Sequence, residues 1–90
     1  MTFDEDKDPD ATLDYVWDWS EWLAADEIIS TVAWIVPDGI NQGDTSNTDK
    51  TATIWLSGGT AIESYEITCR ITTNQGRTDD RTQTIRVIDR

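Results

Sequence analysis

Carboxylates are the side chains of this sequence with the greatest potential for chemistry. The 90 residues include 18 aspartates and glutamates, a single cysteine, Cys69, and no histidine. Without histidine, neither the usual nucleophile–base pairs nor the common zinc sites can be assembled. A glycosidase-like acid pair needs one carboxyl in an apolar pocket, whereas most acids here fall in an N-terminal arm or in turns. The sequence therefore predicts no catalytic residue and no cofactor.

The spacing of Asp4, Asp6 and Asp8 is the sharpest suggestion of a metal. Aspartates at alternate positions open a calcium loop, which also needs glycine sixth and a bidentate glutamate twelfth. Counting from Asp4 gives Pro9 and Tyr15 at those positions. We therefore expect no complete metal site and interpret the aspartates as part of a solvated acidic tail, although a neighbouring subunit could complete a weak calcium site.

Five tryptophans are more indole than a domain of this size hides easily, so some of them should meet a partner. Trp17, Trp19 and Trp22 lie among acids, as on the sugar-stacking faces of carbohydrate-binding modules. However, Trp17 and Trp19 fall on the same face of the expected strand as Leu13 and Tyr15, because all four occupy alternate positions. This placement favours packing inward or against another subunit. The residues that we predict to contact a partner are Trp17, Trp19, Trp22, Trp55 and Arg77, together with Asp4, Asp6 and Asp8 of the arm.

The formal charge of −11 is concentrated at the start of the chain. Residues 1–27 hold ten acids and one lysine, a net charge of −9, which leaves −2 for residues 28–90. This charge distribution argues against nucleic acids and anionic membranes as partners, since phosphate contact needs clustered Lys and Arg. The longest apolar run, residues 32–36, is far shorter than a membrane span. These patterns favour a cytosolic product with protein partners.

Alternation of apolar and polar residues predicts an all-β fold. We expect a flexible acidic arm over residues 1–11 and one domain over residues 12–90. The expected strands in the first half of the domain are 12–19, which is followed by a short turn, and 28–36, which is apolar on both faces and expected to form the centre of the core. Residues 40–50 read as a loop that contains a short edge strand.

The second half of the sequence gives the firmest prediction, with three strands between Thr51 and Val87. Ser57-Gly58-Gly59-Thr60 ends the first of them, and Asn74-Gln75-Gly76-Arg77 forms a hairpin between the other two. Cys69 falls on the inward face and should be buried. Tyr65 follows a Gly-Gly corner, where it is either a tyrosine corner or an ordinary half-exposed strand residue. Together the elements predict a small immunoglobulin-like antiparallel β-sandwich of about six to seven strands.

Five segments stand out: WLSGGT (55–60), ITCRITT (67–73), GRTDDRT (76–82), DYVWDWSEWLA (14–24) and WIVPDGI (34–40), which together span about three quarters of the chain. They resemble small virion proteins of tailed bacteriophages, a family often labelled phage fibre-tail adaptors. The resemblance implies an immunoglobulin-like, non-enzymatic structural part of the particle. Cys69 stands where a polar residue is expected, and the acidic arm is longer than expected, which leaves the docking partner open.

The leading hypothesis is a non-enzymatic virion subunit that is assembled in the host cytoplasm and docks other virion proteins in a multi-copy assembly. Its neighbours would be tail adaptor, nozzle, fibre or capsid subunits, and the acidic arm would fold onto an adjacent chain. One alternative is a capsid cement or decoration protein that stabilises the phage head. A weaker alternative is a carbohydrate-binding module on a receptor-recognition device.

Overall fold

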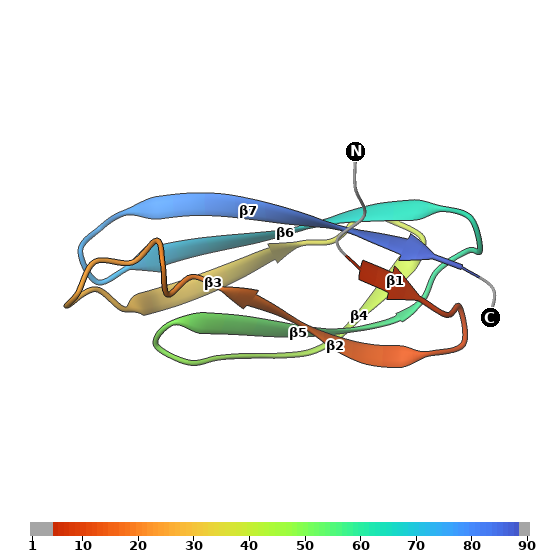
Figure 1. Ribbon diagram of the computed structural model, residues 1–90, viewed down its shortest axis with the longest axis horizontal. Helices are drawn as coiled ribbons and strands as arrows, with labels where there is room; N and C mark the ends of the chain where they lie inside the picture. Colours follow the sequence, from red (N-terminus) through yellow and green to blue (C-terminus); the bar gives the residue numbers. More distant parts are fainter. Residues whose placement is uncertain (1–4, 89–90) are drawn as a thin grey trace.

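The computed structural model describes residues 5–88, in which every regular element is a β-strand (Figure 1). The strands are β1 (Glu5–Lys7), β2 (Thr12–Asp18), β3 (Ile29–Ile35), β4 (Ile40–Asn47), β5 (Thr51–Gly58), β6 (Ser64–Thr73) and β7 (Thr78–Val87). The all-β prediction is therefore confirmed. Within residues 5–88 no helix has the length and apolarity needed to cross a bilayer.

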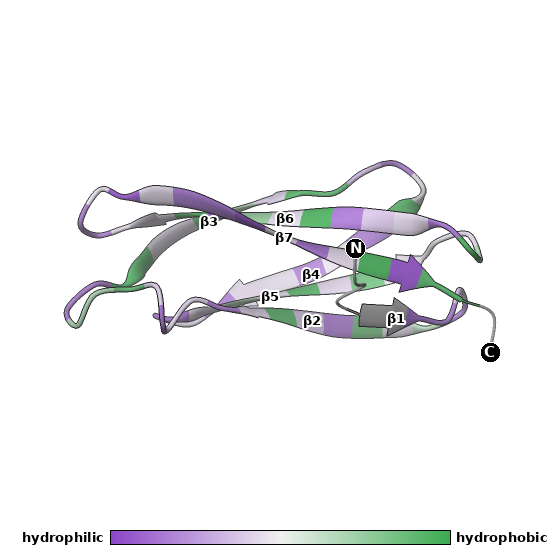
Figure 2. Cartoon of the chain, turned by 45° about the horizontal axis from the view of Figure 1, so that its top comes forward, coloured by the Kyte–Doolittle hydropathy of each residue, from purple (hydrophilic) through white to green (hydrophobic). Residues whose placement is uncertain are grey.

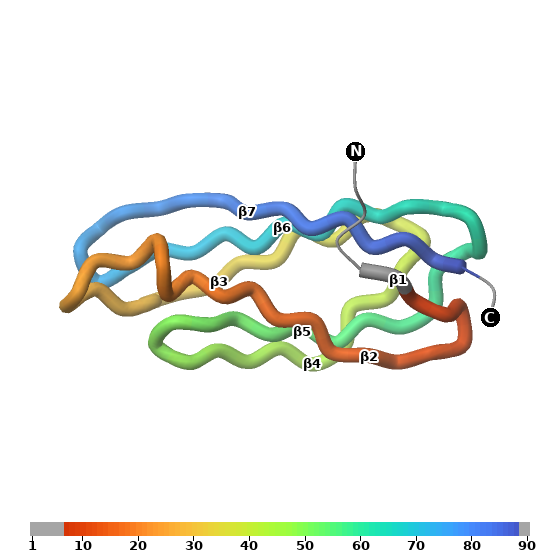
Figure 3. The backbone as a smooth tube through the Cα atoms, in the orientation of Figure 1, coloured from red at the N-terminus to blue at the C-terminus, as the bar shows by residue number. Residues whose placement is uncertain are grey.

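The strands form two sheets that stack as two layers (Figures 1 and 3). One sheet has the order β1-β7-β6-β3 and the other the order β2-β5-β4. Among the described residues, the strands pair in the antiparallel direction apart from β1 and β7, which pair in parallel. The chain passes from one layer to the other between β1 and β2, between β2 and β3, between β3 and β4, and between β5 and β6. This arrangement matches an immunoglobulin-like sandwich.

The core lies between the two sheets, where the alternating strands turn their apolar residues toward each other. Figure 2 shows apolar and polar segments alternating along β6 and β7. On β5, Ala52, Ile54 and Leu56 have no exposed surface, and neither have Ile67, Cys69 and Ile71 on β6. These two strands are interior to their sheets, so the centre of the core follows β5 and β6.

Tyr65 forms a tyrosine corner and is not an ordinary half-exposed strand residue. Its ring is buried, and the backbone N–H of Thr60 donates to the Tyr65 hydroxyl at 2.9 Å. The turn that this bond closes depends on Gly58 and Gly59, whose φ angles are +73° and +95°. The bond ties the end of β5 to the start of β6 and so fixes the passage between the layers.

The prediction that residues 28–36 form the centre of the core is wrong. β3 is the edge strand of its sheet and pairs with β6. Its outward residues Ala33 and Ile35 are exposed, and Val32 and Trp34 are only partly buried. An apolar run on both faces predicts a buried strand, but here the run belongs to an edge strand with one face exposed to solvent.

Residues 40–50 are more regular than the expected loop with a short strand. β4 pairs with β5 along its length, with an irregularity between Gln42 and Thr45. Only Ile40 of this strand is buried. A strand with almost no buried face lacks the alternation by which strands are recognised, which explains why its length was underestimated.

Part of the expected flexible arm is built into the sandwich. β1 pairs with β7, and the Lys7 side chain has no exposed surface. The Lys7 ammonium donates to the carbonyl oxygens of Gly58 at 2.7 Å and Asp8 at 2.9 Å, which satisfies a buried charge. Deletion of residues 1–11 would therefore remove a strand of the fold. The first four residues of the arm, Asp4 among them, lie outside the described residues.

Candidate docking site at one end of the sandwich

Two loops lie together at one end of the sandwich: the connection between β2 and β3, residues 19–28, and the β6–β7 hairpin, residues 74–77 (Figure 3). Trp19 O accepts hydrogen bonds from the N–H groups of Trp22 and Leu23, so the connection begins with a tight turn, as predicted. The loops are joined through Ile28, whose N–H donates to Asn74 Oδ1 at 3.0 Å and whose carbonyl accepts from Asn74 N at 3.1 Å.

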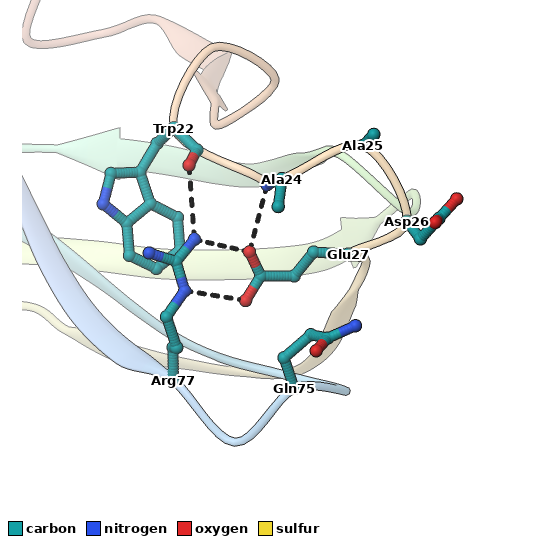
Figure 4. A pocket seen from close by; sticks show the side chains of 7 residues that line it. All are labelled: Trp22, Ala24, Ala25, Asp26, Glu27, Gln75 and Arg77. Carbon is teal, nitrogen blue, oxygen red and sulfur yellow. Dashed lines mark hydrogen bonds and ion pairs between the residues drawn. The ribbon is translucent and has the colours of Figure 1, made fainter.

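Glu27 is the buried polar centre of this loop end (Figure 4). Arg77 binds its carboxylate with two nitrogens, of which Nε donates to Oε2 at 2.9 Å and Nη2 donates to Oε1. The Thr73 hydroxyl donates to Oε2 at 2.6 Å, and the Ala24 N–H donates to Oε1 at 3.1 Å. Both carboxylate oxygens therefore have at least two donors, as burial of a charge requires.

These donors fix the charge state of Glu27. The Arg77 guanidinium and, next, the Thr73 hydroxyl lower the pKa of Glu27 from 4.5 to about 2, although burial acts in the opposite direction. The same contact raises the pKa of Arg77. A general acid needs a pKa near the working pH, so this ionised carboxylate is suited to holding a structure and not to donating a proton.

Trp22 supports the other side of the arginine. The Arg77 guanidinium carbon lies 4.0 Å from the centre of the Trp22 ring, and Nη2 also donates to the Trp22 carbonyl at 3.3 Å. The Trp22 and Trp19 rings in turn meet in a T-shaped arrangement, with 5.5 Å between their centroids. Cation–π contact and hydrogen bonding thus hold Arg77 in one position.

A hollow of about 650 Å³ opens to solvent beside this group. Figure 4 shows its wall formed by the 22–27 segment on one side and by Gln75 and Arg77 on the other. Ala24, Ala25 and Asp26 are exposed on its rim. The small alanine side chains leave the space open, so a side chain of another molecule can enter it.

Of the predicted contact residues, the structure brings Trp22 and Arg77 together at the hollow, with Trp19 buried against Trp22. Trp17 and Trp19 have no exposed surface, so their indoles cannot touch a partner in this fold. Trp17 Nε1 donates to Arg81 O at 3.0 Å, and Arg81 stacks on Trp19 at 4.4 Å. The three-tryptophan sugar-stacking face is therefore not formed, because two of its indoles are internal and Arg77 lies on the third.

Trp55 belongs to a different surface. It lies on the outward side of β5, opposite Asp14 of β2, and 41% of it is exposed. It is therefore available to a partner, as predicted from the number of tryptophans, but its partner would meet the flat face of a sheet and not the loop end.

The aspartates of the predicted acidic contact are only partly described. Asp4 and the side chain of Asp6 lie outside the described residues. Asp8 Oδ1 accepts a hydrogen bond from Asp10 N at 2.8 Å, so this carboxylate stabilises the turn between β1 and β2. In the part of the chain that the structure describes, no group of three or more acids or cysteines has the spacing to hold a metal ion.

Cys69 is buried between the sheets, as predicted, and its position makes it unreactive. Burial raises the pKa of the Cys69 thiol to about 11, so almost no thiolate is present near neutral pH.

Glu27 and Thr73 are the site residues that the sequence did not reveal. Glu27 lies directly before the apolar residues Ile28 and Ile29, and Thr73 ends β6 on its inward parity. The sequence marks these two residues only as an acid beside a strand and as a threonine on the inward face. Neither feature identifies Arg77, which lies fifty positions from Glu27 and pairs with it.

Comparison with known proteins places most of the chain in one family model. The model described as Podophage GP4 fiber-tail adaptor protein gp77 matches residues 7–86, which is 80 of the 90 residues. The match extends from Lys7 in β1 to Arg86 near the end of β7 and includes both loops of the hollow. No curated protein matches the chain.

Proposed function

The chain belongs to the family of the Podophage GP4 fiber-tail adaptor protein gp77, and from this premise we propose that it is a non-catalytic virion subunit that joins tail and fibre proteins. The resemblance to phage fibre-tail adaptors is thereby confirmed. The family description names the tail and the fibre, and the partners of this chain are proposed as proteins of those two structures. Its mechanism is binding geometry.

The fixed loop end is the observation that carries this proposal. Arg77, Glu27 and Trp22 join two loops that are far apart in the sequence, and two hydrogen bonds between Ile28 and Asn74 join them again. A surface that is already ordered loses little conformational entropy when it docks. The hollow beside these residues offers a recess for a partner side chain, with the exposed face of Gln75 and Arg77 as its polar border.

The chemistry of the described residues supports a structural role. Glu27 is held as a carboxylate by Arg77, and the Cys69 thiol is buried and protonated. The strength of the assembly would come from repetition, because many copies with modest interfaces bind together far more tightly than one copy does.

Blocking the hollow tests the proposal. Ala25→Trp fills the recess from an exposed position and leaves Glu27 and its donors in place, while Ala33→Trp adds the same bulk at an exposed position of β3. Each variant would be supplied to particles that lack the wild-type chain, and its incorporation measured by quantitative mass spectrometry. We expect Ala25→Trp to reduce incorporation at least about tenfold and Ala33→Trp to have little effect. Equal incorporation of both variants, with unchanged thermal stability, would refute docking through the loop end.

Copy number tests the location on the particle. A tail component should be present at about six or twelve copies, as cyclic symmetry requires, and a decoration protein of the shell at hundreds. The family assignment favours the tail, and a count in the hundreds would instead support the capsid alternative.

A further inference from the structure

The outward faces of the two sheets differ in how their side chains are paired. On the β6–β7 side, Thr68 bonds to Thr82 at 2.7 Å, Thr72 bonds to Thr78 at 3.1 Å, and Arg70 binds both carboxylate oxygens of Asp80 at 2.7 and 2.9 Å. Strands β3, β6 and β7 together hold three acids and three arginines, a net charge of zero. These polar side chains on the β6–β7 face are therefore bonded to one another across the strands.

The β2-β5-β4 sheet carries a different face. Its three strands hold three aspartates and no lysine or arginine, a net charge of −3. Trp55 is 41% exposed at its centre, and Val16, 49% exposed, lies at the diagonal position on β2. Among the described residues, the cations that hydrogen-bond to this sheet do so at strand ends: Arg81 of β7 donates to the Asp18 carbonyl at the end of β2, and Lys7 of β1 donates to the Gly58 carbonyl at the end of β5.

Asp14 is the immediate neighbour of Trp55 on this face. The two residues are directly opposite in the antiparallel register of β2 and β5, which places their Cβ atoms about 5 Å apart on the same side. On the β4 side no side chain covers the base of the indole, because Gly43 lies there and a Cβ at that position would be 3.3 Å from the Trp55 Cβ. The glycine leaves the aromatic ring open to solvent beside a carboxylate.

An indole face with a neighbouring oxygen acceptor holds an arginine at two places in this protein, and in one of them the acceptor is a carboxylate. Arg77 stacks on Trp22 at 4.0 Å and binds the Glu27 carboxylate, and Arg81 stacks on Trp19 at 4.4 Å and binds the Asp18 carbonyl. In both cases the indole face attracts the cation and a neighbouring oxygen accepts its N–H groups. Among residues 5–88, the structure places no cation on Trp55.

We infer that Trp55 and Asp14 form a receptor for an arginine side chain of a partner protein. This inference rests on the proposed docking role and assigns it a second surface. The guanidinium of the partner stacks on Trp55, its N–H groups bind the Asp14 carboxylate, and its aliphatic stem covers Val16. A second copy of this chain is a poor occupant, because two chains of charge −11 repel each other.

Binding of a small arginine probe tests the chemistry. The five indole N–H signals of the nitrogen-15-labelled full chain would be followed by NMR during titration with N-acetyl-arginine amide, and separately with glucose. We expect the Trp55 signal to move with arginine and not with glucose, and the Trp22 signal to stay, because Arg77 already occupies that ring. Asp14→Asn should weaken binding at least about threefold, and Asp38→Asn, a matched change in a turn, should not. A response to glucose alone, or equal effects of the two variants, would overturn the inference.

Cross-linking in the particle tests the partner. A photoreactive benzoylphenylalanine would replace Val16, which leaves Trp55 and Asp14 in place, or Ile35 as a control of similar exposure on the opposite sheet, and cross-linked peptides would be sequenced. We expect position 16 to capture an arginine-containing segment of another virion protein. Capture of a second copy of this chain, of a segment without arginine, or of nothing would overturn the inference. If Ala25→Trp still blocks incorporation in that case, the docking role stands without this surface.

Discussion

Arg77 binds the buried carboxylate of Glu27 across fifty positions of sequence, and this pair makes one surface out of two loops. The arginine is partly exposed, whereas the carboxylate has no exposed surface. Glu27 is therefore the partner that depends on the contact, because an ionised carboxylate without donors is strongly unfavourable in a buried position.

Stability should fall in acid because of Glu27. Its pKa is about 2 in the folded chain and near 4.5 when unfolded, so the unfolded state binds the proton more readily. The contribution of Glu27 is fully present above about pH 4.5 and is lost as the pH falls toward 2. Thermal midpoints of the wild type and Glu27→Gln should therefore differ most near neutral pH and converge in acid. A difference that stays constant from pH 7 to pH 2 would contradict this.

Loss of the Tyr65 hydroxyl should weaken the link between β5 and β6. In Tyr65→Phe the ring still fills its place, but the Thr60 N–H loses its acceptor at 2.9 Å. We expect the free energy of unfolding to decrease by about 1 kcal/mol, measured by urea denaturation with an unchanged slope. No change in the midpoint would mean that water replaces the hydroxyl without loss.

The sequence predicted those parts of the fold in which one strand face is buried. β5 and β6 alternate cleanly, and Tyr65 and Cys69 lie where the alternation places them. It failed where pairing depends on backbone groups alone: β1 has three residues and many charges around it, and β4 has one buried side chain. Such strands bury almost no apolar surface, so hydrophobic periodicity contains little information about them.

The candidate site was only partly predictable for a related reason. Trp22 and Arg77 were identified because exposed aromatic residues and arginines are frequent in interfaces. Parity indicated that Trp17 and Trp19 face inward, but it could not separate a core position from a subunit contact. Glu27 could not be assigned, because its partner comes from a distant hairpin and contacts of that kind follow from topology.

Replacement of Ile62 by glycine should stabilise the protein. Ile62 has φ = +75°, a conformation that is strained for a β-branched residue, and it is 88% exposed, so its side chain contributes little burial. Relief of strain outweighs the extra entropy of glycine in the unfolded chain, and we expect a gain of about 0.5–1 kcal/mol by urea denaturation. Ile35→Gly, at an exposed strand position with ordinary backbone angles at the end of β3, should instead destabilise by a similar amount. Loss of stability in both variants would argue against strain at Ile62.

Cys69 should react only after unfolding. Its pKa of about 11 and its complete burial leave neither thiolate nor access for a reagent. Ellman's reagent at pH 8 should therefore release no colour from the native chain within minutes and one equivalent after addition of guanidinium chloride. Rapid reaction of the native protein would show that the sheets open locally around β6.

The parallel pairing of β1 with β7 also has a mechanical consequence. The first and last strands of the sandwich lie side by side and run in the same direction, so tension applied between the two ends of the chain pulls their hydrogen bonds in shear, all at once. If the terminal strands were antiparallel, the same tension would break their hydrogen bonds one after another from one end. A subunit that bears load between two parts of a particle gains resistance from this geometry, and optical-tweezer extension of the wild type and Lys7→Ala would measure it.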